Sequence, residues 1–206
     1  MSHGIEYRIA GRVIKITIIC LVRHGETDWN AAGRLQGRTD IPLNENGIFQ
    51  AKECGIFLGE MEWDVMITSP LERAKQTAEI IRDAIKVPLI EMPEFKERSY
   101  GDAEGMTVQE RNTLFPNGLY PNQEERSCLA ERVMSGLEKV TQKFKGQKVL
   151  LVAHGAVINA ILAKLSNGEI GSGKTTLLNA CISNIEFNQK AWKISDFNQV
   201  NHLSKY

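Results

Sequence analysis

Residues 16–25 read ITIICLVRHG, and this stretch decides the fold. Its first seven residues are apolar or β-branched, which predicts a strand buried on both faces of a parallel sheet. The strand ends abruptly in Arg23 and His24. Far downstream, residues 149–155 read VLLVAHG, so a second buried strand ends in His154 and Gly155. Because open α/β sheets build their sites at the carboxyl ends of their strands, the two imidazoles are expected to face one pocket.

The rest of the pattern alternates strands with helices, which predicts a three-layer α/β/α sandwich with a mostly parallel central sheet. Asn44 is expected to cap one helix. Residues 69–72 (SPLE) are expected to form a capping box with Pro70 at the first helical position. Residues 95–122 look irregular, with one short helix near Val108. Strands are expected at 16–22, 65–68, 87–92, 148–153, 181–187 and 191–197, and helices at 45–61, 70–84, 123–144 and 156–165.

Length, charge and cysteine content narrow the class of protein. The chain of 206 residues fits one domain over residues 16–206, with an N-terminal extension at 1–15 and a cap segment at about 98–126. Its 25 basic and 25 acidic residues balance, which argues against a nucleic-acid partner. No apolar run is long enough to span a membrane, so no membrane partner is expected. Four scattered cysteines are expected to be buried thiols in a reducing cytoplasm. The oligomeric state is not readable from the sequence.

The residues around His24 suit phosphoryl transfer, which needs a nucleophile, a positive cradle for the phosphoryl oxygens and an acid for the leaving oxygen. A neutral imidazole can attack phosphorus without first losing a proton from its attacking nitrogen, so His24 is the candidate nucleophile. Arg23 and Arg73 are candidate clamps, because a guanidinium binds phosphate oxygens in bidentate fashion. His154, if protonated, would add a third cation, and Asn30 would add a neutral donor.

Four motifs in this chain resemble those of the histidine phosphatase superfamily, also called the phosphoglycerate-mutase-like family. They are RHGET at 23–27 followed by Trp29 and Asn30, TSPLERAKQTA at 68–78, Glu97 followed by Gly101 and the Glu-Gly pair at 104–105, and His154-Gly155. The resemblance covers residues 16–197. It implies that His24 becomes phosphorylated, that Arg23, Arg73 and His154 bind the phosphate, and that Glu97 protonates the leaving group. Water then releases inorganic phosphate. Contacts to the substrate are also expected from Gln36, Gly37, Arg98, Tyr100 and Gly155, and no metal or other cofactor is expected.

The assignment of the general acid has two rivals. A carboxyl group that donates a proton near neutral pH needs a pKa raised by burial, whereas the nearby cations would lower the pKa of Glu97. The sequence leaves that balance open. Glu94 and Glu104 are the competing acids, although the spacing from Glu97 to Gly101 fits the family.

The favoured function is a phosphatase that hydrolyses small organic phosphomonoesters through a phosphohistidine on His24. The short stretch 98–153, with no lysine before Lys139, and the Gln36-Gly37 pair favour hydrolysis over mutase activity. Residues 97–101 (ERSYG) resemble the mutase version of the third motif, so a cofactor-dependent phosphoglycerate mutase is one alternative. A noncatalytic domain that binds a phosphorylated ligand is the other. Apolar cap residues are expected to line the approach of the substrate: Met106, Leu114, Phe115, Leu119 and Tyr120.

One further motif matches a phosphate-binding pattern by letter alone. Residues 168–175 read GEIGSGKT, the P-loop pattern. A working P-loop follows a buried strand, whereas residues 156–165 are expected to be helical. The segment is therefore interpreted as a flexible loop rather than a nucleotide site.

Overall fold

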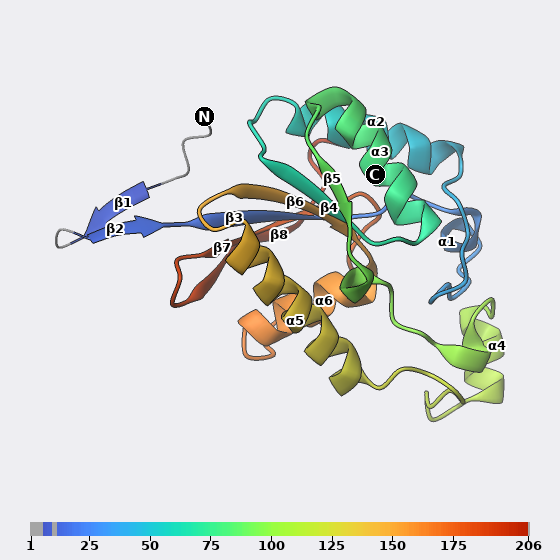
Figure 1. Ribbon diagram of the computed structural model, residues 1–206. Helices are drawn as coiled ribbons and strands as arrows, with labels where there is room; N and C mark the ends of the chain where they lie inside the picture. Colours follow the sequence, from blue (N-terminus) through green and yellow to red (C-terminus); the bar gives the residue numbers. More distant parts are fainter. Residues whose placement is uncertain (1–5, 10–11, 206) are drawn as a thin grey trace.

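The computed structural model describes residues 6–9 and 12–205, and its main feature is a six-stranded sheet (Figure 1). The order across the sheet is β5-β4-β6-β3-β7-β8, in which β5, β4, β6 and β3 run parallel and the hairpin β7–β8 is antiparallel. The prediction of a mostly parallel sheet is confirmed. The bounds of the strands are β3 (Thr17–Arg23), β4 (Val65–Thr68), β5 (Leu89–Glu91), β6 (Lys148–Ala153), β7 (Ile182–Phe187) and β8 (Trp192–Gln199).

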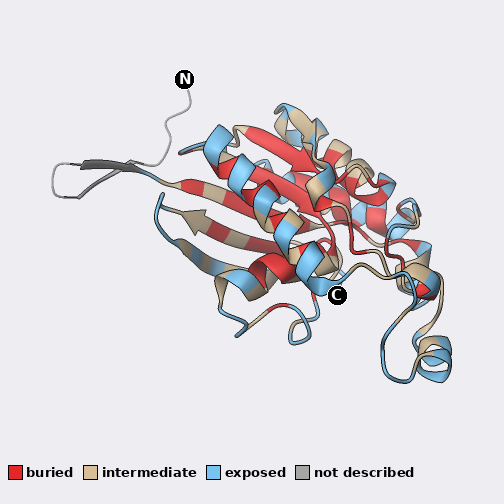
Figure 2. Cartoon of the chain, turned by 60° about the horizontal axis from the view of Figure 1, so that its bottom comes forward, coloured by how far each residue is buried: buried red, intermediate tan, exposed pale blue. Residues whose placement is uncertain are grey.

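Helices cover both faces of this sheet, which confirms the three-layer arrangement (Figures 1 and 2). Alternate side chains of β3 enter two separate cores, because successive residues of a strand point to opposite faces. Cys20 and Val22 pack with one core, and Ile19 and Leu21 with the other. The first core lies under α2 (Glu45–Leu58) and α3 (Glu72–Ile85), and the second under α5 (Arg126–Lys143) and α6 (Gly155–Leu165).

The loop after β3 is held by a close approach of two glycines. A Cβ atom at Gly25 would lie 2.4 Å from the carbonyl oxygen of Gly47 in α2, and one at Gly47 would lie 2.0 Å from the carbonyl oxygen of Glu26. Asn44 caps α2 by accepting from the N–H of Gly47, as predicted. The N-terminus of α2 therefore packs directly against the chain that follows His24.

The expected capping box at residues 69–72 is wrong. Helix α3 begins at Glu72, and its N-cap Leu71 makes no side-chain cap bond. Ser69 accepts instead from the N–H of Leu71 and lies 2.8 Å from Nε2 of His154, so its hydroxyl belongs to the end of β4. The N–H of Glu72 donates to Asp40 at 2.7 Å, a partner that lies 32 residues away in the chain.

Other boundaries differ from the sequence interpretation. Helix α5 begins at Arg126 rather than residue 123, because Gln123 and Glu124 bind the side chain of Arg98. The short helix near Val108 is present as α4 (Val108–Leu114). Two features were not anticipated, a one-turn helix α1 (Asp28–Ala31) and an antiparallel pair within the proposed extension, β1 (Glu6–Ile9) and β2 (Arg12–Lys15). The domain boundary at residue 16 stays a prediction. Within the described part of the chain, no helix combines the length and apolar character needed to cross a membrane.

Candidate active site

The register of the central strands brings the two motif histidines together. Arg23 of β3 lies opposite Ala153 of β6 in a parallel pair, so the next residues, His24 and His154, become neighbours. Their ring centroids are 5.2 Å apart at an interplanar angle of 58°. The two imidazoles are therefore neighbours, but of the two only His24 lines the cavity, so the expectation that both face one pocket is met only in part.

His24 is held as a neutral ring with a defined tautomer. Its Nδ1 lies 2.7 Å from the carbonyl oxygen of Gly25, so Nδ1 carries the proton and donates. Nε2 then bears a lone pair, which accepts from Nε of Arg73 at 3.3 Å. Burial lowers the pKa of His24 well below its usual value, and the charges of Arg73 and Arg23 lower it further. A neutral imidazole with an unprotonated Nε2 is the form that can attack phosphorus.

The two arginines of the motifs frame this lone pair. Arg73 is 1 % exposed, and its Nη1 and Nη2 donate to the carbonyl oxygens of Thr39 and Gly37, at 3.1 and 2.7 Å. Gly37 has φ +58, and a Cβ there would collide with Glu104, so this carbonyl position requires glycine. Arg23 is anchored by a bond from Nη1 to the carbonyl oxygen of Leu177. Both guanidinium groups are therefore fixed before any anion arrives.

His154 differs from the expectation of a third cation. Its Nε2 contacts Ser69, while Nδ1 is buried and has no hydrogen-bond partner among the described residues. Burial lowers the pKa of His154 well below its usual value, and the charges of Arg73 and Arg23 act in the same direction. The ring is thus neutral, and Nδ1 is its ring nitrogen without a partner among the described residues.

Asn30 is oriented by a residue that the sequence interpretation missed. The Oδ1 atom of Asn30 accepts from the backbone and hydroxyl of Thr27 and, at 3.0 Å, from Nδ2 of Asn179. These bonds leave the amide nitrogen of Asn30 to donate into the cavity. Asn179 also donates to the carbonyl oxygens of His24 and Gly25. No motif in the sequence marks Asn179, which lies 149 residues from Asn30.

Glu97 is the buried carboxyl group of the site, 8 % exposed. It accepts from the N–H of Arg98 at 2.8 Å and from the N–H of Ala156, near the start of α6, at 3.2 Å. Burial raises the pKa of Glu97, and this effect outweighs the lowering caused by those two bonds and by Arg73 and Arg23. The balance that the sequence left open therefore favours a carboxyl group that can hold a proton.

The two rival acids have the opposite property. A hydrogen bond from Lys139 lowers the pKa of Glu94. Partial burial would raise the pKa of Glu104, but hydrogen bonds from Thr39, Arg38 and Tyr100 outweigh it and lower the pKa overall. Both groups are ionised near neutral pH, so neither suits the role of general acid.

The predicted site residues line one cavity of about 350 Å³. His154 is the exception, because it lies buried against His24. The apolar cap residues named above do not line this cavity, and Leu114 and Leu119 are exposed, so the expected apolar approach is wrong. The lining includes Arg23, His24, Asn30, Gln36, Gly37, Arg73, Glu97, Arg98, Tyr100 and Gly155. It also includes residues outside the predicted substrate contacts: Arg34, Leu35, Arg126, Leu129, Ala156, Asn159, Ser172, Gly173, Thr175, Thr176 and Leu177.

The loop that matches the P-loop pattern by letter follows α6 rather than a strand. Its Lys174 donates from Nζ to the carbonyl oxygen of Gly168 at 2.6 Å, within the same loop. Ser172 and Gly173 form part of the cavity wall. Over residues 6–9 and 12–205, no group of three or more His, Cys, Asp or Glu side chains is arranged to hold a metal ion.

Fold and site together define the class of protein. A largely parallel α/β sheet that gathers two histidines and two arginines at the carboxyl ends of its strands is a phosphate-binding, phosphoryl-transfer architecture. Residues 19–200 match the histidine phosphatase superfamily (branch 1), and the chain belongs to that family.

Individual relatives agree with this assignment. "Uncharacterized phosphatase PhoE" of Bacillus subtilis (strain 168) is 51 % identical over 191 residues, which cover 93 % of this chain and 99 % of the relative. "Metal-independent phosphoserine phosphatase" of Arabidopsis thaliana is 37 % identical and covers 92 % of this chain and 84 % of its own length. A solved phosphoserine phosphatase mutant from Entamoeba histolytica in complex with phosphoserine superposes with a TM-score of 0.79 at 30 % identity, covering 91 % of this chain and 99 % of its own. The prediction of a phosphatase is thereby confirmed.

Proposed function

We propose that this chain hydrolyses small organic phosphomonoesters with His24 as nucleophile and Glu97 as general acid. The observation that carries the proposal is the opposite perturbation of two buried groups in one cavity. The pKa of His24 is lowered and that of Glu97 is raised, in each case first by burial. A base that is neutral and an acid that is protonated can therefore coexist, which is the pattern of an acid–base pair tuned by environment.

In the first step, Nε2 of His24 attacks phosphorus while the bond to the leaving oxygen breaks. Glu97 gives its proton to that oxygen, so the alcohol departs neutral. Arg23, Arg73 and Nδ1 of His154 bind the phosphoryl oxygens, with the amide nitrogen of Asn30. In the second step, the carboxylate of Glu97 takes a proton from water as the water attacks the phosphohistidine. Inorganic phosphate leaves, and both groups return to their starting states.

The outer wall of the cavity favours a substrate with a second anionic group. Arg126 lines the cavity and forms no ion pair among the described residues. Burial raises the pKa of Tyr100, so its hydroxyl remains a neutral donor beside Arg98, with the guanidinium 5.1 Å from the ring. We infer that the substrate is a phosphorylated hydroxy or amino acid, and relatives named phosphoserine phosphatase support this class. Gln36, Gly37 and Gly155 complete the substrate contacts.

The test compares O-phospho-L-serine with phosphoethanolamine, which lacks the carboxylate, in wild type and Arg126→Gln. We expect the variant to lose about tenfold in kcat/KM with phosphoserine, the size of one charge-assisted contact, and little with phosphoethanolamine. Arg111→Gln in the cap is the matched control, because its guanidinium binds the carbonyl oxygen of Met106 away from the cavity. Equal losses with both substrates would refute the carboxylate contact.

Two further measurements address the alternatives. Turnover in the presence of EDTA checks metal independence, and activity that Mg²⁺ or Zn²⁺ restores would contradict it. Incubation with 3-phosphoglycerate separates release of inorganic phosphate from transfer to the neighbouring hydroxyl, which a mutase would catalyse. Failure to turn over any phosphomonoester, with binding retained, would support the noncatalytic alternative.

A cytoplasmic location remains part of this proposal, supported by four cysteines without disulfides, three of them buried and Cys128 exposed.

A further inference from the structure

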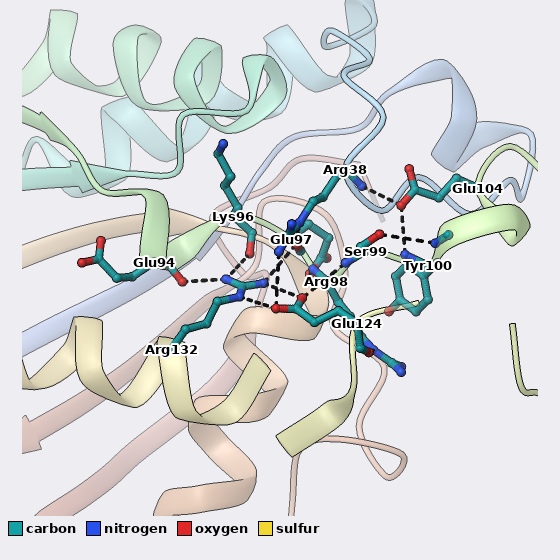
Figure 3. A network of polar contacts seen from close by, with 11 residues as sticks. Arg38, Glu94, Lys96, Glu97, Arg98, Ser99, Tyr100, Glu104, Glu124 and Arg132 are labelled. Atoms are coloured by element: carbon teal, nitrogen blue, oxygen red, sulfur yellow. Dashed lines mark hydrogen bonds and ion pairs between the residues drawn. The ribbon is translucent and has the colours of Figure 1, made fainter. Parts of the chain in front are cut away.

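The chain around Glu97 has neither a helix nor a strand to hold it. It lies between the short turns η1 (Pro93–Phe95) and η2 (Gly101–Ala103), so its carbonyl groups need donors from elsewhere. Arg132 of α5 supplies them (Figure 3). Its Nη1 donates to the carbonyl oxygens of Glu94 and Lys96, at 2.7 and 2.8 Å, and its Nη2 donates to that of Glu97 at 3.1 Å.

The remaining donors of Arg132 bind the carboxylate of Glu124. Nε reaches Oε1 at 2.6 Å and Nη2 reaches Oε2 at 2.8 Å, a bidentate pair. The two side chains are only 21 and 12 % exposed, so solvent screens the pair weakly. All five N–H groups of the guanidinium therefore have an acceptor. A lysine has three donors and no planar fork, so it could not reproduce this set.

Glu97 is consequently held at both ends of the residue. Its carbonyl oxygen is bound by Arg132, with Nε of Arg38 at 3.4 Å, and its carboxyl group is bound by the N–H groups of Arg98 and Ala156. Arg132 does not line the cavity. Its hydrogen bond to Glu97 is to the backbone carbonyl alone, so its direct effect on this residue is to fix where the carboxyl group stands.

We propose that Arg132 is a positioning residue for the general acid. It clamps the backbone of residues 94–97 onto α5, so that the carboxyl group of Glu97 meets the leaving oxygen. The proposal rests on the proposed function, in which Glu97 is that acid. A displacement of about 1 Å in a catalytic group can cost on the order of 100-fold in rate.

The test uses substrates that differ in their need for the acid. An alkyl phosphate leaves as a poor alkoxide, whereas p-nitrophenolate leaves without much help. We expect Arg132→Gln to lower kcat/KM for the alkyl phosphate by about 10- to 100-fold and for p-nitrophenyl phosphate by less than about threefold. In a Glu97→Gln background, Arg132→Gln should cause no further selective loss, because the acid is already absent. Arg132→Lys should restore only part of the activity toward the alkyl phosphate.

Lys139→Gln is the matched control. Lys139 also lies on α5 and also binds the segment before Glu97, through Oε1 of Glu94 at 2.6 Å, but it is 60 % exposed and does not touch Glu97. It should leave both substrates unchanged. Thermal unfolding of every variant identifies the folded fraction, and Arg132→Lys, which keeps the cation, carries the test if Arg132→Gln does not fold.

The outcomes distinguish a failure of the positioning role of Arg132 from a failure of the proposed function. A uniform loss with both substrates in Arg132→Gln, while Glu97→Gln remains selective for the alkyl phosphate, would overturn the positioning role and leave the proposed function intact. A uniform loss in Glu97→Gln would remove Glu97 from the acid role, and the role of Arg132 would fall with it. An Arg132→Gln effect that is equally selective in the Glu97→Gln background would show that Arg132 acts on another group.

Discussion

Arg73 donates a hydrogen bond from Nε to Nε2 of His24 across 3.3 Å. This bond requires an unprotonated nitrogen, because a protonated imidazole has no lone pair to accept it. The arginine that we propose binds the phosphoryl group therefore also favours the unprotonated form of the proposed nucleophile. A phosphoryl group entering between them would meet a guanidinium and a lone pair that are already aligned.

His24→Ala is expected to fold and to abolish turnover of p-nitrophenyl phosphate. Among the described histidines, only His24 lines the cavity, and its Nδ1 is fixed as a donor so that Nε2 can attack. Wild type alone should yield a phosphoryl adduct that is labile in acid and stable in base, detected after a quench without acid. His202→Ala is the matched control, because that ring is stacked on Phe57 outside the cavity. Substantial residual turnover in His24→Ala would rule out the covalent role.

Glu97→Gln is expected to slow an alkyl phosphate far more than p-nitrophenyl phosphate. General acid catalysis contributes about 10²- to 10⁴-fold, and only the poor leaving group needs it in full. Steady-state kcat/KM with both substrates measures the difference. Glu104→Gln is the control, because that carboxylate binds Thr39 and Tyr100 and is held ionised. If Glu104→Gln showed the selective loss and Glu97→Gln did not, the acid would be Glu104.

The free energy of unfolding is expected to fall as the pH drops below about 6.5, the ordinary pKa of histidine. His24 and His154 have lowered pKa values in the folded state, so above this pH both states are neutral and the two groups add no pH dependence. Below it, the unfolded chain binds protons that the folded chain refuses. Each histidine then contributes up to about 1.4 kcal/mol per pH unit.

Urea unfolding at several pH values measures this slope, and His24→Asn should reduce it by the share of one histidine. The raised pKa of Glu97 acts in the opposite direction, so Glu97→Gln should steepen the loss as the pH falls. A stability that does not change between neutral and mildly acidic pH in all three proteins would contradict the buried neutral state of the histidines.

Lys174→Ala is expected to leave phosphatase kinetics nearly unchanged. Its ammonium group donates to the carbonyl oxygen of Gly168 within the same loop. The loop follows a helix, whereas a P-loop lysine lies in a loop that follows a buried strand. Calorimetry should detect no ATP binding that depends on this residue. Micromolar affinity for ATP that disappears in Lys174→Ala would revive the nucleotide-site interpretation.

The sequence predicted the site best where short-range patterns determine it. The apolar runs that end in His24 and His154 define two central strands, and parallel pairing then places both rings at one edge. Arg73 and Glu97 were found through motifs. The competition between burial and neighbouring charge on Glu97 could not be resolved, because it depends on how deeply the folded protein encloses the carboxyl group.

The features that the sequence did not predict depend on contacts between residues far apart in the chain. Asp40 takes over the cap of α3 that Ser69 was expected to provide, because the loop before α2 passes the start of that helix. No motif marks Asn179 or Arg132, although Arg132 lies in a predicted helix, and each gains its role only when folding brings it to Asn30 or Glu97. The apolar residues of the cap were expected to line the approach of the substrate. None of them lines the cavity, which is lined mainly by polar and charged residues.

The proposed cap has its two ends joined at Ser99 and Glu124, and its residues 104–107 also bond to residues 34–39. The N–H of Glu124 donates to the carbonyl oxygen of Ser99 at 2.9 Å, and the same glutamate receives the fork of Arg132 (Figure 3). The segment between Ser99 and Glu124, which includes α4 in Figure 1, is a loop whose two ends are joined close to Glu97. Lengthening such a closed loop costs little, about 0.6 kcal/mol for each doubling. Evolution, or an engineer, can thus lengthen the largely exposed stretch 112–119 without disturbing the cavity or the contacts that Met106 and Thr107 make with Leu35 and Arg34.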